Sequence, residues 1–164
     1  MKIGIRRSAV KILNRSVLLA SVMFVILAAP AAAAPGDGYK VEQGFAVYIG
    51  VLPAAMIQGH EVDHAETSMH GGVPGGRNAH HLTVAVFDAR TGSRIENATV
   101  RARVFPLGLA GTTRPLNPMT IAGTITYGNY FMFADGPYRI RLTISLPEQS
   151  QPVNMEFSYE HPTR

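Results

Sequence analysis

Apolar and polar residues alternate along several short runs in the second half of the chain. The clearest run covers residues 138–146, where Ile140 and Leu142 alternate with arginine and threonine. Residues 81–87 and 98–105 show the same period of two. Because successive side chains of a β-strand point to opposite faces, this period predicts strands with one buried face and one exposed face.

Four further runs are rich in Val, Ile, Thr, Tyr and Phe and lie between turn signals. They cover residues 45–52, 120–127, 130–133 and 153–159. Strands of this number, with no helical periodicity after the first 33 residues, predict an all-β domain built as a β-sandwich of about seven strands. A closed barrel is the alternative, because counting strands does not distinguish the two architectures.

The first 33 residues differ in composition from the rest of the chain. They contain five basic residues and no acidic residue, and an apolar run covers residues 17–29. Alanines at positions 31 and 33 satisfy the small-residue rule for cleavage by signal peptidase. We therefore expect a signal peptide at residues 1–33, a mature chain that starts at Ala34, and a periplasmic location. An uncleaved membrane anchor is the alternative, and the pair Arg6-Arg7 leaves Sec and twin-arginine export both open.

Removal of this leader changes the charge balance of the protein. The chain has 15 Lys and Arg against 11 Asp and Glu, and five of the basic residues belong to the leader. The arginines that remain are scattered along the sequence, which argues against a nucleic-acid partner. The chain has no Cys, so it has no disulfide and no lipid-modified cysteine. Its length suits one domain, expected at residues 45–164 after a loose lead-in at residues 34–44.

One stretch, residues 58–80, has no strand pattern and concentrates residues that bind transition metals. Five of the six histidines fall between positions 60 and 81. Imidazole suits copper, zinc, iron and nickel, whereas the thioether of Met69 favours Cu(I) because thioethers are soft ligands. The carboxylates of Glu61, Asp63 and Glu66 leave zinc and iron open. The loop therefore predicts a transition-metal site, with copper as the favoured ion.

The candidate ligands come from this loop and from two places outside it. His60 and His64 would share a helical face if the loop formed a turn there. His80 and His81 begin a predicted strand, so their side chains should point to opposite faces and only one should join the loop. Met119 is a further thioether candidate, whereas a methionine between two phenylalanines at position 132 is expected in the core. The full set of predicted metal ligands is His60, His64, Met69, His70, His80, His81 and Met119.

The chain offers little support for an enzyme. It has no G-x-S-x-G nucleophile elbow, and no Lys-Ser or Lys-Thr follows its glycine pairs, so hydrolase and nucleotide-binding functions are not indicated. The metal signal itself is one of composition. Two alternatives stay open: an incidental polar loop, and a contact surface for an envelope or membrane protein.

Two stretches resemble bacterial envelope domains of the YtkA-like and FixH-like kind. Residues 81–100 match their strand, D-x-x-T-G-x-x-I-x-x-A-x-V turn and second strand, and residues 128–140 match a later G-x-Y … G-x-Y-x-I element. The resemblance implies an immunoglobulin-like β-sandwich outside the cytoplasm, in a group linked with metal handling or the assembly of membrane oxidases. The histidine-rich loop is not part of the shared pattern, so a metal role depends on this chain's own residues.

These features favour a non-enzymatic periplasmic protein that binds or delivers a transition metal, most simply copper, through the His/Met-rich loop. The competing hypothesis is an envelope interaction module or an iron-uptake accessory, in which metal binding by the loop is incidental. The sequence does not choose between these functions, and it leaves the oligomeric state open.

Overall fold

The computed structural model describes residues 38–58 and 72–162. The predicted signal peptide lies outside these ranges, as do four of the predicted ligands, His60, His64, Met69 and His70. The described residues form an all-β domain with one short helix, α1 (Ala54–Gln58). No helix in this part of the chain is both long enough and apolar enough to cross a membrane.

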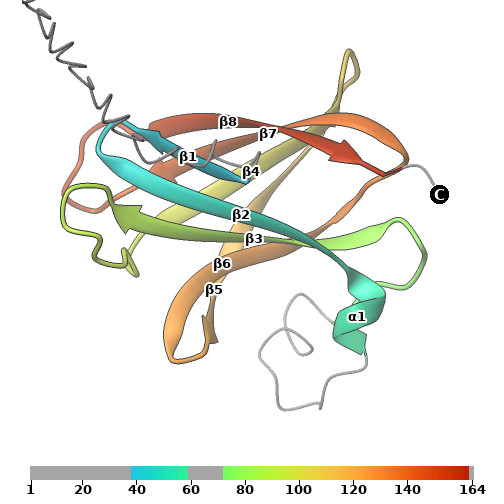
Figure 1. Ribbon diagram of the computed structural model, residues 1–164, viewed down its shortest axis with the longest axis horizontal. Helices are drawn as coiled ribbons and strands as arrows, with labels where there is room; N and C mark the ends of the chain where they lie inside the picture. Colours follow the sequence, from blue (N-terminus) through green and yellow to red (C-terminus); the bar gives the residue numbers. More distant parts are fainter. Residues whose placement is uncertain (1–37, 59–71, 163–164) are drawn as a thin grey trace, which may run out of the picture. The chain divides into compact units, whose positions relative to one another are not determined.

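Eight strands make up the domain, and every neighbouring pair is antiparallel (Figure 1). They are β1 (Tyr39–Glu42), β2 (Phe45–Pro53), β3 (Ala79–Asp88), β4 (Thr99–Pro106), β5 (Thr112–Ile121), β6 (Thr124–Met132), β7 (Gly136–Ser145) and β8 (Val153–His161). Their order across the sheet is β1-β2-β3-β6-β5-β4-β7-β8.

Strand β5 joins the two layers of the sandwich. Its residues 112–116 pair with β4, and its residues 117–121 pair with β6. A strand that changes sheet in this way turns the corner between two packed layers. At the other edge, Lys40 Nζ on β1 donates a 2.6 Å hydrogen bond to the carbonyl oxygen of Glu156 on β8. The all-β sandwich prediction is confirmed, with eight strands and two edges that nearly close on each other.

The core lies between the layers and follows the period-two pattern of the sequence. In β7, Ile140 and Leu142 are fully buried, as the alternation predicted. Tyr127 of β6 is also fully buried, and its hydroxyl accepts a hydrogen bond from Ala98 N (3.0 Å) and donates one to Ile95 O (3.2 Å). The one polar group of this large side chain is therefore satisfied inside the core.

One strand prediction was wrong in position, and two strands were not predicted. The predicted strand at 120–127 contains a turn, because Ala122 and Gly123 adopt φ values of +50° and +77°. Such left-handed pairs form the tight turns that match the twist of a hairpin. Strand β5 was not predicted, since Pro115 and Pro118 interrupt its pattern, and β1 falls inside the stretch expected to be a loose lead-in.

Two further expectations were wrong: the burial of Met132 and the bounds of the expected loop. Met132, expected in the core, is 61% exposed because it follows the outward face of β6. The expected loop at 58–80 is shorter at both ends, since Gln58 belongs to α1 and β3 begins at Ala79.

Candidate functional site

His80 and His81 start β3 and point to opposite faces of the sheet. His80 faces inward, where its ring contacts Phe133 of the core at a centroid distance of 5.6 Å. His81 faces outward and packs against Tyr130 at 4.7 Å. The expectation that the two side chains point to opposite faces of the sheet is confirmed, and His81 is the one on the outer face.

Met119 of β5 and His81 of β3 converge over Gly128 of β6, the strand between them. In the register, His81 lies opposite Tyr130 and Met119 lies opposite Thr126, so Gly128 stands between them on the same face. A Cβ atom added to Gly128 would stand 2.7 Å from His81 Nε2 and still closer to Met119 Cε. The absence of a side chain at Gly128 makes the space in which the imidazole and the thioether meet.

Both side chains are held away from solvent. His81 is 1% exposed and Met119 is 3% exposed, and both ring nitrogens of His81 are buried. Tyr130, which stacks on the imidazole at an interplanar angle of 32°, belongs to a second apolar cluster outside the main core. The other members of this cluster are Ala54 and Ile57 of α1, Ala79 and the partly buried Val73. Helix α1 therefore helps to fix the position of His81 through Tyr130.

The donor atoms of this pair suit a soft or borderline metal ion. An imidazole nitrogen binds copper, zinc and iron, whereas a thioether narrows the choice toward Cu(I). The described residues contain no group of three or more His, Cys, Asp and Glu that could hold a metal ion. The pair can therefore supply two ligands, and a complete site needs donors from elsewhere in the chain or from solvent.

Four of the predicted ligands, His60, His64, Met69 and His70, belong to a segment outside the described ranges. Ile57 precedes the segment and Val73 follows it, and both pack in the cluster that holds Tyr130. Residues 60–64 also read His-Glu-Val-Asp-His, the H-E-x-x-H pattern in which two histidines one helical turn apart bind zinc. These residues lie outside the described ranges.

A second histidine contact joins the two layers on the inner side. The rings of His80 and His161 lie edge to face, with centroids 4.5 Å apart, and His161 Nδ1 lies 3.3 Å from the hydroxyl of Tyr159. His80 Nδ1 lies 3.0 Å from the carbonyl oxygen of Asn78, which can only accept, so this nitrogen carries the proton. Nothing in the sequence pattern indicated His161, because only the approach of β8 to β3 brings it here.

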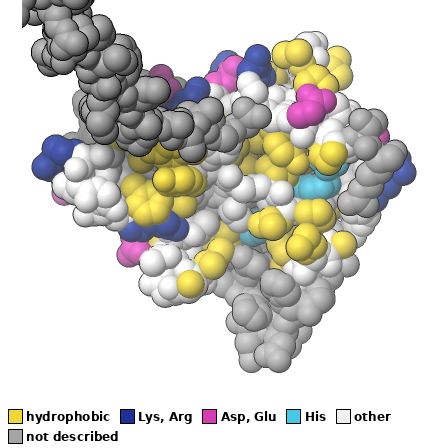
Figure 2. All heavy atoms as spheres, in the orientation of Figure 1, with side chains coloured by type: hydrophobic (Ala, Val, Ile, Leu, Met, Phe, Trp, Pro, Cys, Tyr) yellow, Lys and Arg dark blue, Asp and Glu magenta, His cyan; other side chains and the backbone are white. Residues whose placement is uncertain are grey.

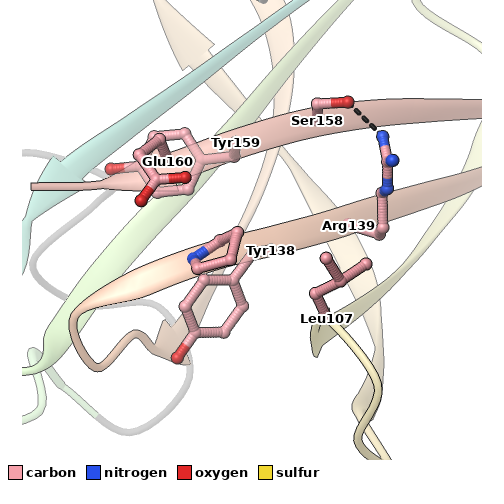
Figure 3. A pocket seen from close by; sticks show the side chains of 7 residues that line it. Leu107, Tyr138, Arg139, Ser158, Tyr159 and Glu160 are labelled. Atoms are coloured by element: carbon pink, nitrogen blue, oxygen red, sulfur yellow. Dashed lines mark hydrogen bonds between the residues drawn. The ribbon is translucent and has the colours of Figure 1, made fainter.

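Two surface pockets lie away from His81 and Met119. One, of about 300 Å³, opens between β2 and β8 and is lined mainly by Ile49, Val51 and Tyr159. Burial raises the pKa of Tyr159. Apolar side chains gather in the middle of the face shown in Figure 2, with histidine among them. The other pocket, of about 210 Å³, lies between Leu107 and Arg139 (Figure 3).

Comparisons with known proteins support the fold. No protein-family model matches the chain, and no curated protein matches it. A copper-bound variant of FetP from uropathogenic Escherichia coli superposes with a TM-score of 0.58 over 75% of this chain and 93% of FetP, at 13% identity. Copper-reconstituted P19 from Campylobacter jejuni superposes with a TM-score of 0.57 over 75% of this chain and 92% of P19, at 15% identity.

A third similar structure belongs to a protein of the DUF4426 family from Pseudomonas aeruginosa. It superposes with a TM-score of 0.52 over 75% of this chain and 94% of that protein, at 13% identity. At such identities the likeness establishes a shared all-β architecture and nothing finer. The resemblance to YtkA-like and FixH-like domains is not confirmed by these comparisons.

Proposed function

We propose that this protein is a periplasmic copper-binding protein whose site is centred on His81 and Met119. The observation that carries the proposal is the convergence of these two side chains over Gly128. A buried imidazole and a buried thioether from non-adjacent strands match the preference of Cu(I) for soft ligands. The protein is not an enzyme in this proposal, and its chemistry is the binding and exchange of a metal ion.

Three further observations support copper and the periplasm. The chain has no Cys, so His and Met are the remaining ligands that suit copper in an oxidising compartment. The structures of FetP and P19 to which the chain is similar contain copper, and one FetP sample was expressed in the periplasm. The first 33 residues have the composition of a signal peptide.

The predicted ligands His60, His64, Met69 and His70 are the candidates for completing the site. His80 takes no part, because it faces the core and Phe133. The glycines at positions 71, 72, 75 and 76 also suit delivery, since ligand exchange with a partner requires access to the metal.

The test is a competition titration of Cu(I) against a chelator of known affinity under anaerobic conditions. We expect one equivalent to bind and the variants His81→Gln and Met119→Leu to lose affinity by at least roughly tenfold, as changes beside a metal usually do. Met132→Leu is the matched control, because Met132 is an exposed methionine on β6. Circular dichroism of each variant checks that the fold is retained.

Parallel titrations with Zn(II) and Fe(II) separate copper binding from the alternatives. Met119→Leu should leave Zn(II) binding nearly unchanged, because zinc gains little from a thioether. Unchanged Cu(I) affinity in both folded variants would overturn the site. Tighter binding of Fe(II) than of copper would favour the iron-uptake alternative instead.

A further inference from the structure

Strand β4 carries a gradient from basic to apolar residues on its outer face. Arg101, Arg103 and Phe105 alternate with the buried residues of the strand, so they share the face that points away from the core, and Leu107 lies in the turn directly after the strand. Successive members of such a row are about 6.8 Å apart, since a strand rises about 3.4 Å per residue. The guanidinium groups of Arg101 and Arg103 therefore lie at one end of the row, and Leu107 follows its other end.

Strand β7 adds two more arginines beside this row. Arg141 lies directly opposite Arg103, and Arg139 lies directly opposite Phe105. Like charges in directly opposed positions destabilise a sheet. The ring of Phe105 partly offsets this cost, because the guanidinium carbons of Arg103 and Arg141 lie 5.3 Å and 5.7 Å from its centroid. Arginines that seemed scattered along the sequence are gathered here by the pairing of β4 with β7.

Carboxylates neutralise only part of this surface. Glu156 of β8 lies 2.7 Å from Arg141 and 3.8 Å from Arg139, and Glu160 is the other acidic residue on the same face of β8. In the described part of the chain, Arg101 and Arg103 form no ion pair. The positive charge is therefore least compensated along β4.

The hairpin that follows β4 ends in two exposed leucines. Leu107 is 59% exposed and Leu109 is 68% exposed. The turn is held in place, since Leu107 N donates to Pro137 O and Leu109 N donates to Pro106 O, each at 3.0 Å. Figure 3 shows Leu107 beside Arg139, so the apolar turn adjoins the basic residues. Large exposed apolar side chains next to a charged surface are typical of an interaction site.

We propose that this surface, which we call the Arg–Leu face, binds an anionic lipid bilayer. It consists of Arg101, Arg103, Phe105, Leu107, Leu109, Arg139 and Arg141. The order along β4 matches the order of layers in a bilayer, because the leucines at the turn would enter the acyl region while the arginines farther along the strands reach the phosphates. Interfacial segments bury their apolar side chains about 5–10 Å into this boundary. Arg139 lies opposite Phe105, two residues before Leu107, which is a separation of about 7 Å along the strand. Arginine suits the phosphate level because its guanidinium binds phosphate oxygens in pairs.

A bilayer fits these features better than an acidic protein does. The leucines lie in an exposed turn, and the nearest arginines on β4, Arg103 and Arg101, have no carboxylate partner in the described part of the chain. A protein interface of this charge would place its apolar contacts at the centre with charges at the rim. Here the apolar end and the basic end are separated along one axis.

The test is co-sedimentation of the chain Ala34–Arg164 with lipid vesicles. All strand pairing and the core lie within residues 38–162, and omission of the apolar leader removes a segment that would bind lipid by itself. We expect binding to vesicles of phosphatidylglycerol and phosphatidylcholine, weaker binding at high salt, and no binding to phosphatidylcholine alone. The double variant Arg101→Gln/Arg103→Gln should bind about thirtyfold more weakly, since each arginine near an anionic surface contributes about fivefold.

Further variants distinguish insertion of the leucines into the bilayer from binding by charge alone. Leu107→Ser/Leu109→Ser should weaken binding at every salt concentration, and Glu160→Gln should strengthen it. Arg90→Gln, in the exposed turn after β3, is the control and should bind like the wild type. His81→Gln should also bind normally, which keeps this surface separate from the copper proposal. Absence of binding to the anionic vesicles, equal loss in the Arg90 control, or binding to an acidic peptide without binding to vesicles would each overturn the proposal.

Discussion

The imidazole of His81 and the thioether of Met119 meet over the Cα atom of Gly128, although β3 and β5 are separated by β6. Strands β3 and β5 do not pair with each other, and a side chain at position 128 would occupy the space between the two donors. The backbone of β6 is therefore as much a part of this arrangement as the two side chains are.

Replacement of Gly128 by Ala tests this relationship. The added methyl group must displace the imidazole, the thioether or both, so we expect a loss of about 1–3 kcal/mol in the free energy of unfolding, as overpacking usually causes. The Cu(I) affinity should fall by about 10- to 100-fold, the range for changes next to metal ligands. Chemical denaturation and chelator competition measure the two effects.

Gly75→Ala is the control for that substitution. Gly75 is exposed, and a Cβ atom there would meet no atom within 4 Å. Its stability and its Cu(I) affinity should match those of the wild type. Equal behaviour of the two variants would mean that His81 and Met119 do not depend on the space over Gly128.

The histidines at positions 60, 64 and 70, which lie outside the described ranges, should contribute to the Cu(I) affinity. The triple variant His60→Ala/His64→Ala/His70→Ala should keep the fold and lose Cu(I) affinity, whereas His161→Asn at the inner contact should bind copper like the wild type. Metal analysis by mass spectrometry of protein purified from the periplasm measures which ion is bound. A wild-type protein that binds Zn(II) in preference to copper would favour the H-E-x-x-H pattern of residues 60–64 over the His81–Met119 pair.

The buried hydroxyl of Tyr127 should contribute measurably to the free energy of unfolding. Tyr127→Phe removes the acceptor for Ala98 N and the donor to Ile95 O while it keeps the ring in the core. We expect a loss of about 1–3 kcal/mol in the free energy of unfolding, because the backbone groups of positions 95 and 98 lose their partner. Tyr48→Phe, at a half-exposed position of β2, should change stability by less than about 0.5 kcal/mol. A similar loss in both variants would mean that the hydroxyl of Tyr127 contributes nothing specific.

Asp88 should account for part of the stability that the domain loses at acidic pH. Hydrogen bonds from the backbone N–H of Thr91 and then from its hydroxyl hold the pKa of the Asp88 carboxyl below its ordinary value. A carboxyl whose pKa is lower in the folded state stabilises the fold above its unfolded pKa, and this contribution disappears as the pH falls through the folded pKa. Asp88→Asn should therefore lose less stability on acidification than the wild type does.

Thr91→Val refines the Asp88 test, because it removes the hydroxyl and keeps the backbone N–H. Its acid dependence should lie between those of the wild type and Asp88→Asn, as measured by the thermal midpoint at a series of pH values. Superimposable pH profiles for all three proteins would contradict the assignment of this effect to Asp88.

The sequence by itself determined the class of fold and the inner face of most strands. Alternation in residues 138–146 predicted which side chains of β7 are buried, because a strand's two faces follow directly from its covalent geometry. The opposite directions of His80 and His81 follow from the same rule. A tight turn inside 120–127 escaped prediction, since an Ala-Gly pair at φ values near +50° and +77° leaves no strong local signal.

Only the tertiary structure decided which residues meet. His81 and Met119 approach each other because β6 lies between their strands, and Arg103 faces Arg141 because β4 pairs with β7. His161 reaches His80 only because β8 closes toward β3. Local patterns specify the face on which a side chain lies, whereas the order and register of strands depend on packing between distant segments, which no period in a single sequence records.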